Sequence, residues 1–186
     1  MSRILEELAG DIGVHERTLR RAVAEGTIRA HRESPYKLEL PVAERHYVRT
    51  HWPAIGALRT ALRTEPGVWC AVLFGSTARG DDAVDSDLDL LVWMGDSTHA
   101  ARHALARRLT ARVGREVQVV DVRDARNQPS LLESILREGR VVVDRGGHWP
   151  ALAASAAGLR RRAARERRVL ADRAAAAREF FISAAQ

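Results

Sequence analysis

Residues 71–92 read AVLFGSTARGDDAVDSDLDLLV, and this stretch decides the fold of the chain. The apolar residues before Gly75-Ser76 predict a buried strand that stops at a glycine. After ten further residues, Asp87-Leu88-Asp89 opens a second apolar run, which predicts another strand. Because successive side chains of a strand point to opposite faces, Asp87 and Asp89 are expected to share one face. Two carboxylates this close repel each other unless a cation lies between them, so the pair favours a Mg²⁺ site.

The turn after the first strand has the residue types of a phosphate-binding site. Gly75 lets the backbone approach a phosphate closely, and the Ser76 hydroxyl and neighbouring N–H groups can bind phosphate oxygens. Arg79 follows in the same loop; its guanidinium suits phosphate oxygens, with a solvated loop arginine as an equal alternative. The other acids of this loop are expected to bind no metal, namely Asp81, Asp82 and Asp85. Together with the paired carboxylates, the turn favours two-metal phosphoryl or nucleotidyl transfer.

The Gly75-Ser76 pair, the ten-residue gap and Asp87-x-Asp89 resemble the signature of the polymerase β-like nucleotidyltransferases. The similarity is strongest to the minimal, antitoxin-type branch and covers roughly residues 58–144. It implies an α/β (α+β) fold with a mixed sheet. It also implies a nucleoside triphosphate substrate, ATP or another, used with Mg²⁺.

The resemblance further implies a third carboxylate on a third strand. Asp121 ends the apolar run 117–122 and is the matching position, as a third metal ligand or as the base that accepts the proton of the attacking hydroxyl. Asp124 is the competing position, but it lies beyond the predicted strand. The expected catalytic and metal-binding residues are therefore Asp87, Asp89 and Asp121, with the nucleotide at Gly75, Ser76 and Arg79.

Residues 1–40 predict a small module that precedes the nucleotidyltransferase-like region 41–148. Two short helices flank a turn at Gly13, and two short strands follow around Ser34-Pro35. This order resembles a winged helix-turn-helix, whose second helix would meet DNA. The side chains expected to contact DNA are His15, Arg17, Thr18, Arg20 and Arg21. The alternatives are a helical cap on the catalytic region, or a module for dimerisation or partner contact.

Residues 149–186 predict one long basic helix. Residues 151–186 contain eight arginines and three acids, net +5, whereas the whole chain carries +6. An apolar stripe runs along this helix and includes Leu159, Ala163, Leu170, Ala177 and Phe181. Such an apolar stripe must pack against another surface, which we expect to be the chain's own domain or a twin subunit. The outward arginines would then meet an acidic macromolecular acceptor.

By resemblance, the expected reaction moves a nucleoside monophosphate, AMP from ATP, onto a protein, often a partner toxin encoded by a neighbouring gene. The first alternative is an aminoglycoside-type enzyme with a small-molecule acceptor, although the sequence shows no acidic substrate domain. The second alternative is a non-catalytic DNA-binding antitoxin or regulator, against which the intact motif argues.

The composition sets the remaining limits. With 186 residues and 46% apolar content, one domain plus a small module is expected. Cys70 is the single cysteine, so no disulfide forms within the chain, and a reducing cytoplasm is the expected location. We see no leader-like segment and no apolar stretch of membrane-spanning length, so no membrane association is expected. All basic residues except Lys37 are arginine, a bias of GC-rich genomes that weakens each arginine as a functional indicator.

Overall fold

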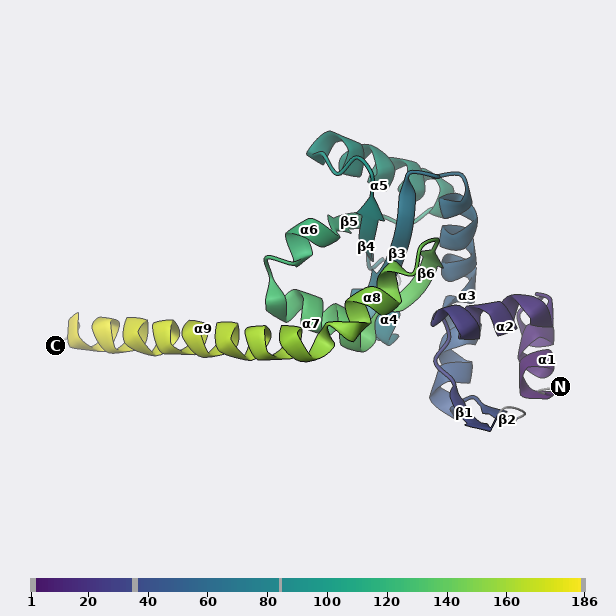
Figure 1. Ribbon diagram of the computed structural model, residues 1–186, viewed down its shortest axis with the longest axis horizontal. Helices are drawn as coiled ribbons and strands as arrows, with labels where there is room; N and C mark the ends of the chain where they lie inside the picture. Colours follow the sequence, from purple (N-terminus) through teal and green to yellow (C-terminus); the bar gives the residue numbers. More distant parts are fainter. Residues whose placement is uncertain (1–2, 35–36, 84, 185–186) are drawn as a thin grey trace.

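The computed structural model of the protein is built around a four-stranded sheet with the strand order β5-β4-β3-β6 (Figure 1). It describes residues 3–34, 37–83 and 85–184. The strands are β3 (Val68–Phe74), β4 (Leu88–Met94), β5 (Val117–Asp121) and β6 (Arg140–Asp144). β4 pairs with β5 in parallel, and β3 pairs antiparallel with both β4 and β6, so the sheet is mixed. This confirms the α/β fold with a mixed sheet that the sequence predicts.

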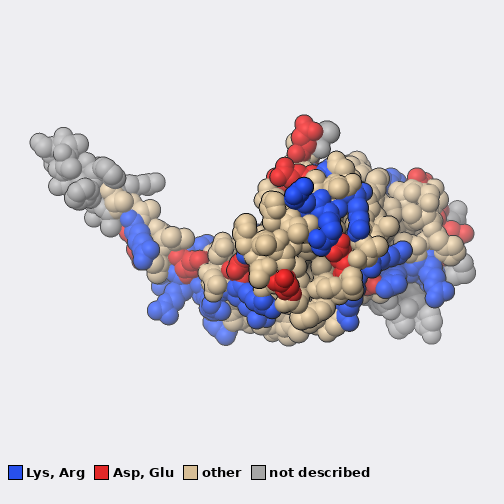
Figure 2. Space-filling model, turned by 90° about the horizontal axis from the view of Figure 1, so that it is seen from above, with Lys and Arg blue, Asp and Glu red and all other residues tan. Residues whose placement is uncertain are grey.

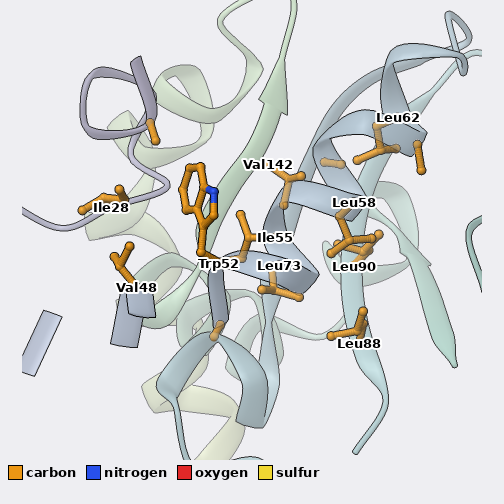
Figure 3. Packing of buried hydrophobic residues seen from close by; sticks show 14 of the residues in the cluster. Ile28, Val48, Trp52, Ile55, Leu58, Leu62, Leu73, Leu88, Leu90 and Val142 are labelled. Atoms are coloured by element: carbon orange, nitrogen blue, oxygen red, sulfur yellow. The ribbon is translucent and has the colours of Figure 1, made fainter. Parts of the chain in front are cut away.

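Helices cover both faces of the sheet, which explains why β3 is apolar on both of its sides. Leu73 and Leu90 belong to one buried cluster with Leu58, on the side of α3 and α5 (Figure 3). Val72 and Leu91 belong to a second cluster, on the side of α6, α7 and α8. These helices are α3 (Val42–Arg63), α5 (His99–Val113), α6 (Val122–Ala125), α7 (Pro129–Glu138) and α8 (His148–Ala154). The alternation along each strand therefore assigns every strand residue to one of two faces.

The N-terminal module has the predicted order of two helices and a hairpin. Its elements are α1 (Arg3–Asp11), α2 (Glu16–Glu25), β1 (His31–Ser34) and β2 (Lys37–Glu39), with β1 antiparallel to β2. Ile28 of this module lies in the same buried cluster as Val48 and Trp52 of α3, and that cluster continues to the sheet (Figure 3). The expected boundary after residue 40 therefore falls within continuous packing, so the module and the sheet share one core.

A buried arginine ties the module to the sheet. Arg140 opens β6 and is 2% exposed. Its guanidinium pairs with Glu44 of α3 at 2.5 Å and donates to the carbonyl oxygens of Thr27 (3.3 Å) and Ala78 (2.7 Å). The same group lies 3.4 Å from the centre of the Tyr47 ring, a cation–π contact. A charge is tolerated in a protein interior only when it is paired and hydrogen-bonded, and here the partners come from three parts of the fold.

The C-terminal helix α9 (Ala156–Ala184) is docked along its first turns. Leu159 and Ala163 are buried, and Leu159 joins the cluster that contains the apolar side of α7. Glu166 accepts hydrogen bonds from the backbone N–H (2.9 Å) and the hydroxyl (2.6 Å) of Ser130, the second residue of α7. The chain's own domain therefore covers the first part of the predicted apolar stripe.

The rest of α9 projects from the body of the molecule toward the C-terminus (Figure 1). Val169 and Leu170 are 43% and 56% exposed, so the domain does not cover them. The predicted end of the stripe, the Phe181 side chain, lies outside the part of the chain that the structure describes. Within the described ranges, no helix has an apolar stretch long enough to cross a lipid bilayer.

Removing the partner of Arg140 should destabilise the fold strongly. In Glu44→Leu the buried guanidinium loses its carboxylate, and we expect the free energy of unfolding to fall by about 3–5 kcal/mol. Urea denaturation followed by circular dichroism measures the change. The double variant Glu44→Leu/Arg140→Met buries no unpaired charge and should recover much of the loss. Equal losses in the single and double variants would contradict a decisive role for the ion pair.

Candidate active site

The two motif carboxylates lie where β3 ends and β4 begins. Asp89 pairs with Phe74, the last residue of β3, and alternation places it on the same face as Leu91. Asp87 stands immediately before β4 and, by the same alternation, on the same face. Directly after Phe74 the chain turns into the short helix α4 (Gly75–Arg79). The structure therefore brings both acids and the start of α4 to one edge of the sheet.

Gly75 makes this close approach possible. Its φ of +73° lies in the left-handed region, which residues with a side chain disfavour. A Cβ atom at this position would lie 2.3 Å from Oδ2 of Asp89, far inside contact distance. The glycine is therefore required both by the turn and by the carboxylate that rests against it.

The two carboxylates disfavour each other electrostatically. Burial raises the pKa of Asp89, and the negative charge of Asp87 raises it further, whereas the charge of Arg79 lowers it. The ionised form of Asp89 is thus less stable here than in water. A divalent cation between the two acids would reverse this effect, because an opposite charge favours the ionised form.

The strand β5 places the side-chain amide of Gln118 beside these acids. In the parallel pairing of β4 with β5, Asp89 lies opposite Gln118. Nε2 of Gln118 donates a hydrogen bond to Oδ2 of Asp87 at 2.5 Å. Sequence reasoning missed Gln118, because a neutral side chain is not a typical metal ligand. The period-two pattern Val117-Gln118-Val119 is the signal that could have placed it on the face of the acids.

Asp121 lies away from Asp87 and Asp89, so the prediction that it is a third metal ligand is corrected. In the pairing of β4 with β5, Asp121 lies opposite Val92. Val92 is three residues beyond Asp89 on β4, a separation of about 10 Å along the strand. The odd number of residues also places Asp121 on the other face of the sheet. Its side chain is 2% exposed, and Oδ1 caps α6 by accepting the N–H of Arg123 at 2.7 Å. The register of β5 against β4, which the local sequence does not fix, is the reason for the error.

The competing acid is not at the site either. Asp124 lies on α6, is exposed and forms an ion pair with Arg102 of α5. Neither candidate for a third carboxylate therefore meets Asp87 and Asp89.

Ser76 and Arg79 lie on α4, next to the acids. Ser76 is partly exposed, and its carbonyl oxygen accepts two backbone N–H groups that close the helix. Arg79 is exposed and pairs with Asp81 (3.1 Å) and with Glu138 of α7 (3.2 Å). Because its charge also lowers the pKa of Asp89, Arg79 is close enough to act on an anion bound at the carboxylates.

The family model described as "Polymerase beta, Nucleotidyltransferase" matches residues 57–147, a range that contains all four strands and α4. These residues form a polymerase β-type nucleotidyltransferase domain. The resemblance that the Gly-Ser and Asp-x-Asp motifs indicate is thereby confirmed.

Solved structures share the fold of the nucleotidyltransferase domain. A chain from the crystal structure of a toxin–antitoxin complex with AMP-PNP is 24% identical, with a TM-score of 0.55, over 64% of this chain and 97% of that chain. A chain from the structure of a tri-AMPylated Shewanella oneidensis HEPN toxin in complex with an MNT antitoxin is 21% identical, with a TM-score of 0.52, over 67% and 98%. No curated protein shows significant similarity to the chain. At these identities the solved structures establish a common fold.

A buried aspartate holds the motif loop of the nucleotidyltransferase domain in place. Asp82 accepts hydrogen bonds from Nε2 of His51 (2.8 Å), from Thr77 (3.2 Å) and from Arg115 (3.1 Å). Burial opposes its ionisation, but these hydrogen bonds outweigh burial and lower the pKa of Asp82. The loop acid that was expected to bind no metal therefore fixes the segment between α4 and β4.

Asp87 and Asp89 suit a bound Mg²⁺ whose remaining ligands would come from a substrate. Asp87 and Asp89 would hold the ion, and phosphate oxygens of a nucleotide would complete its preferred all-oxygen coordination. Among the described residues, no three His, Cys, Asp or Glu side chains come together to hold a metal by themselves. For such an ion the described part of the domain would therefore offer two carboxylates.

The predicted DNA-contacting residues lie on and just before α2. His15 caps this helix, because its Nδ1 accepts the N–H of Arg17 at 3.1 Å. Arg20 pairs with Glu16 (2.7 Å) and Arg21 pairs with Glu25 (2.6 Å), both along the helix. Arg17 is exposed and Thr18 is partly buried. The helix therefore exposes basic side chains whose charge is partly balanced by its own acids.

Asp89→Asn should stabilise the metal-free protein and abolish its response to Mg²⁺. Because the pKa of Asp89 is raised, its contribution to stability is present below its ordinary pKa and is lost as the pH rises through the raised value. At neutral pH, asparagine removes the buried charge and its repulsion by Asp87. Thermal unfolding in EDTA should give a higher midpoint for the variant, whereas Mg²⁺ with an ATP analogue should stabilise only the wild type.

The matched control is Asp85→Asn, which changes an exposed acid of the same loop. This variant should keep the midpoint of the wild type in EDTA and its full response to Mg²⁺. An Asp89→Asn protein that Mg²⁺ and the analogue still stabilise would show that Asp89 is not a metal ligand.

Proposed function

We propose that the chain transfers AMP from ATP onto a hydroxyl group of a protein acceptor, the toxin partner of a toxin–antitoxin pair. The observation that carries the proposal is the carboxylate pair Asp87 and Asp89, held beside Gly75 in a nucleotidyltransferase domain. A hydroxyl acceptor is the nucleophile that such a site suits, because the reaction needs positioning and charge stabilisation rather than a covalent intermediate.

In the proposed reaction, the acceptor hydroxyl oxygen attacks the α-phosphorus of ATP. A new P–O bond forms, the bond from the α-phosphorus to the bridging oxygen breaks, and pyrophosphate leaves while the hydroxyl proton is released. Bound Mg²⁺ would supply charge stabilisation at the phosphate oxygens. Asp87 and Asp89 would hold the ion, and Ser76 and Arg79 would orient the triphosphate, because a hydroxyl and a guanidinium both donate hydrogen bonds to phosphate oxygens.

Two observations support a protein acceptor. The solved structures that share the fold include a toxin–antitoxin complex with AMP-PNP and a tri-AMPylated HEPN toxin in complex with an MNT antitoxin. The projecting part of α9 carries arginines along its described length (Figure 2), and such a surface attracts an acidic partner and accelerates its encounter. We therefore assign acceptor binding to α9 and chemistry to the sheet edge.

An aminoglycoside-type acceptor is less well supported, because such a polycation needs acidic walls. The hollow beside α4 has a volume of about 560 Å³, and the charged side chains in its lining are Arg79, Arg115 and Asp82. The acid in this hollow, Asp82, is already engaged by three hydrogen-bond donors. In this hollow, a polycation would therefore meet two guanidinium groups and one carboxylate that already has its partners.

The test of the proposed function is label transfer from α-labelled ATP to the protein encoded by the neighbouring gene. The wild type should label this acceptor with Mg²⁺ and not with EDTA. Asp89→Asn should lower the rate by roughly 10²-fold or more, the usual effect of removing an electrostatic catalytic group. Asp85→Asn should leave the rate unchanged. Label on an added aminoglycoside but on no protein would replace the proposal by the small-molecule alternative.

We also propose that α2 binds DNA, on the basis of its exposed Arg17 and its helix–turn–helix–hairpin context. A gel-shift assay with the chain's own upstream DNA should show binding that weakens as salt rises. Replacing Arg17, Arg20 and Arg21 with alanine should abolish the shift and leave the Mg²⁺–ATP response intact. Absence of a shift at low salt would identify the module as a cap or partner surface, and a shift without any label transfer would favour the non-catalytic regulator.

A further inference from the structure

The ends of three neighbouring strands, β3, β4 and β5, meet at the edge of the sheet where the acids lie. β3 ends at the Gly75 turn, β4 places Asp89 against that turn, and β5 places Gln118 opposite Asp89. Gln118 is exposed, and its amide donates to Oδ2 of Asp87 at 2.5 Å. The position on the third strand that faces both acids is therefore filled by a neutral group.

We infer that Gln118 is a positioning residue that fixes Asp87 for a single divalent cation, and that this site lacks a third carboxylate to hold a second ion or to accept the proton of the acceptor. The inference rests on the proposed function and specifies the machinery behind it. It replaces the expectation of three acids with two acids and one amide.

The charge of the described residues supports one ion. Asp87 and Asp89 together carry two negative charges, which balance one divalent cation. Phosphate oxygens of the nucleotide could also bind a second ion, but to fix that ion the protein would have to supply a further carboxylate, and no third acid joins this pair within the described ranges. The amide of Gln118 adds no negative charge to the site, and its N–H donates to Asp87. One oxygen of Asp87 is thereby oriented by Gln118, and the other remains available to the ion.

Among the described residues, the β5 side of the site adds no further acid to the pair of Asp87 and Asp89. A hollow of about 680 Å³ lies between α5 and β5, and Gln118 is one of its lining residues. Its other charged or titratable lining residues are His99, Arg102, His103, Arg107 and Glu116. Glu116 precedes β5 and is exposed, and it forms no metal-holding group with Asp87 and Asp89. On this side, the described residues therefore place no third carboxylate beside Asp87 and Asp89 that could accept the proton of an acceptor hydroxyl.

The experiment counts Mn²⁺ ions bound in the presence of an ATP analogue that cannot be cleaved at the α-phosphorus. Calorimetry gives the number and affinity of the ions, and electron paramagnetic resonance reports their ligand environment. The wild type should bind one tight ion per chain. Gln118→Leu, which keeps the size but frees Asp87, should weaken this ion roughly 10–100-fold, the usual loss when a hydrogen-bonded support of a metal ligand is removed.

Gln118→Glu should do the opposite, because it adds a negative charge and a proton acceptor at the same place. We expect a second Mn²⁺ or at least roughly ten-fold tighter binding, a changed resonance spectrum and faster label transfer. The matched control Glu116→Gln alters an acid two residues away on the same side of β5 and should leave the ion count and affinity at the values of the wild type. Unchanged unfolding midpoints in EDTA would show that the variants fold.

Two outcomes would overturn the inference and are distinguishable from failure of the proposed function. Two tight ions in the wild type, or an ion affinity that Gln118→Leu does not change, would remove the role of Gln118 while label transfer by the wild type persists. A wild type that binds no Mn²⁺ with the analogue and labels no acceptor would remove the proposed function together with the inference.

Discussion

The guanidinium of Arg140 is the constraint on which the rest of this structure depends. A buried cation needs a full set of partners, and Arg140 finds them in Glu44 and Tyr47 of α3, in the Thr27 carbonyl and in the Ala78 carbonyl of α4. Because these partners must be in place at the same time, the N-terminal module, the helix α3 and the short helix α4 adopt one mutual arrangement. The helix α4, which begins at Gly75, is thus held in position by a buried charge at Arg140.

The neighbouring Tyr47 continues this support toward the motif loop. Burial raises the pKa of Tyr47 to about 12, so its hydroxyl stays protonated and donates to the Thr77 carbonyl at 3.0 Å. The Thr77 hydroxyl in turn donates to Asp82, which also accepts from His51 and Arg115. A chain of satisfied polar groups therefore runs from the buried arginine to the loop before β4, and it presents Asp87 and Asp89 from a rigid base.

The sequence was sufficient for those parts of the fold that depend on local pattern. The apolar run before Gly75 and the alternation after Asp87 specify β3, β4 and the shared face of the acids, because strand periodicity is a local property. The position of Asp121 was not predictable in this way, since it depends on how β5 slides against β4. Strand periodicity could have placed Gln118 on the face of the acids, but its neutral side chain did not mark it as part of the site. The partners of Arg140 are separated from it by up to 113 residues, so they could not be inferred from spacing.

The extended shape of α9 places most of this helix away from the sheet edge that carries Asp87 and Asp89 (Figure 1). Its 29 residues correspond to a rod of roughly 40 Å, of which only the first turns rest on α7. Val169 and Leu170 on this arm are exposed, so residues at such positions can change without disturbing the packing around the sheet edge. Selection for a new binding partner would therefore act on the arm alone, and a family of such chains could diversify its partners while the chemistry at the sheet stays the same.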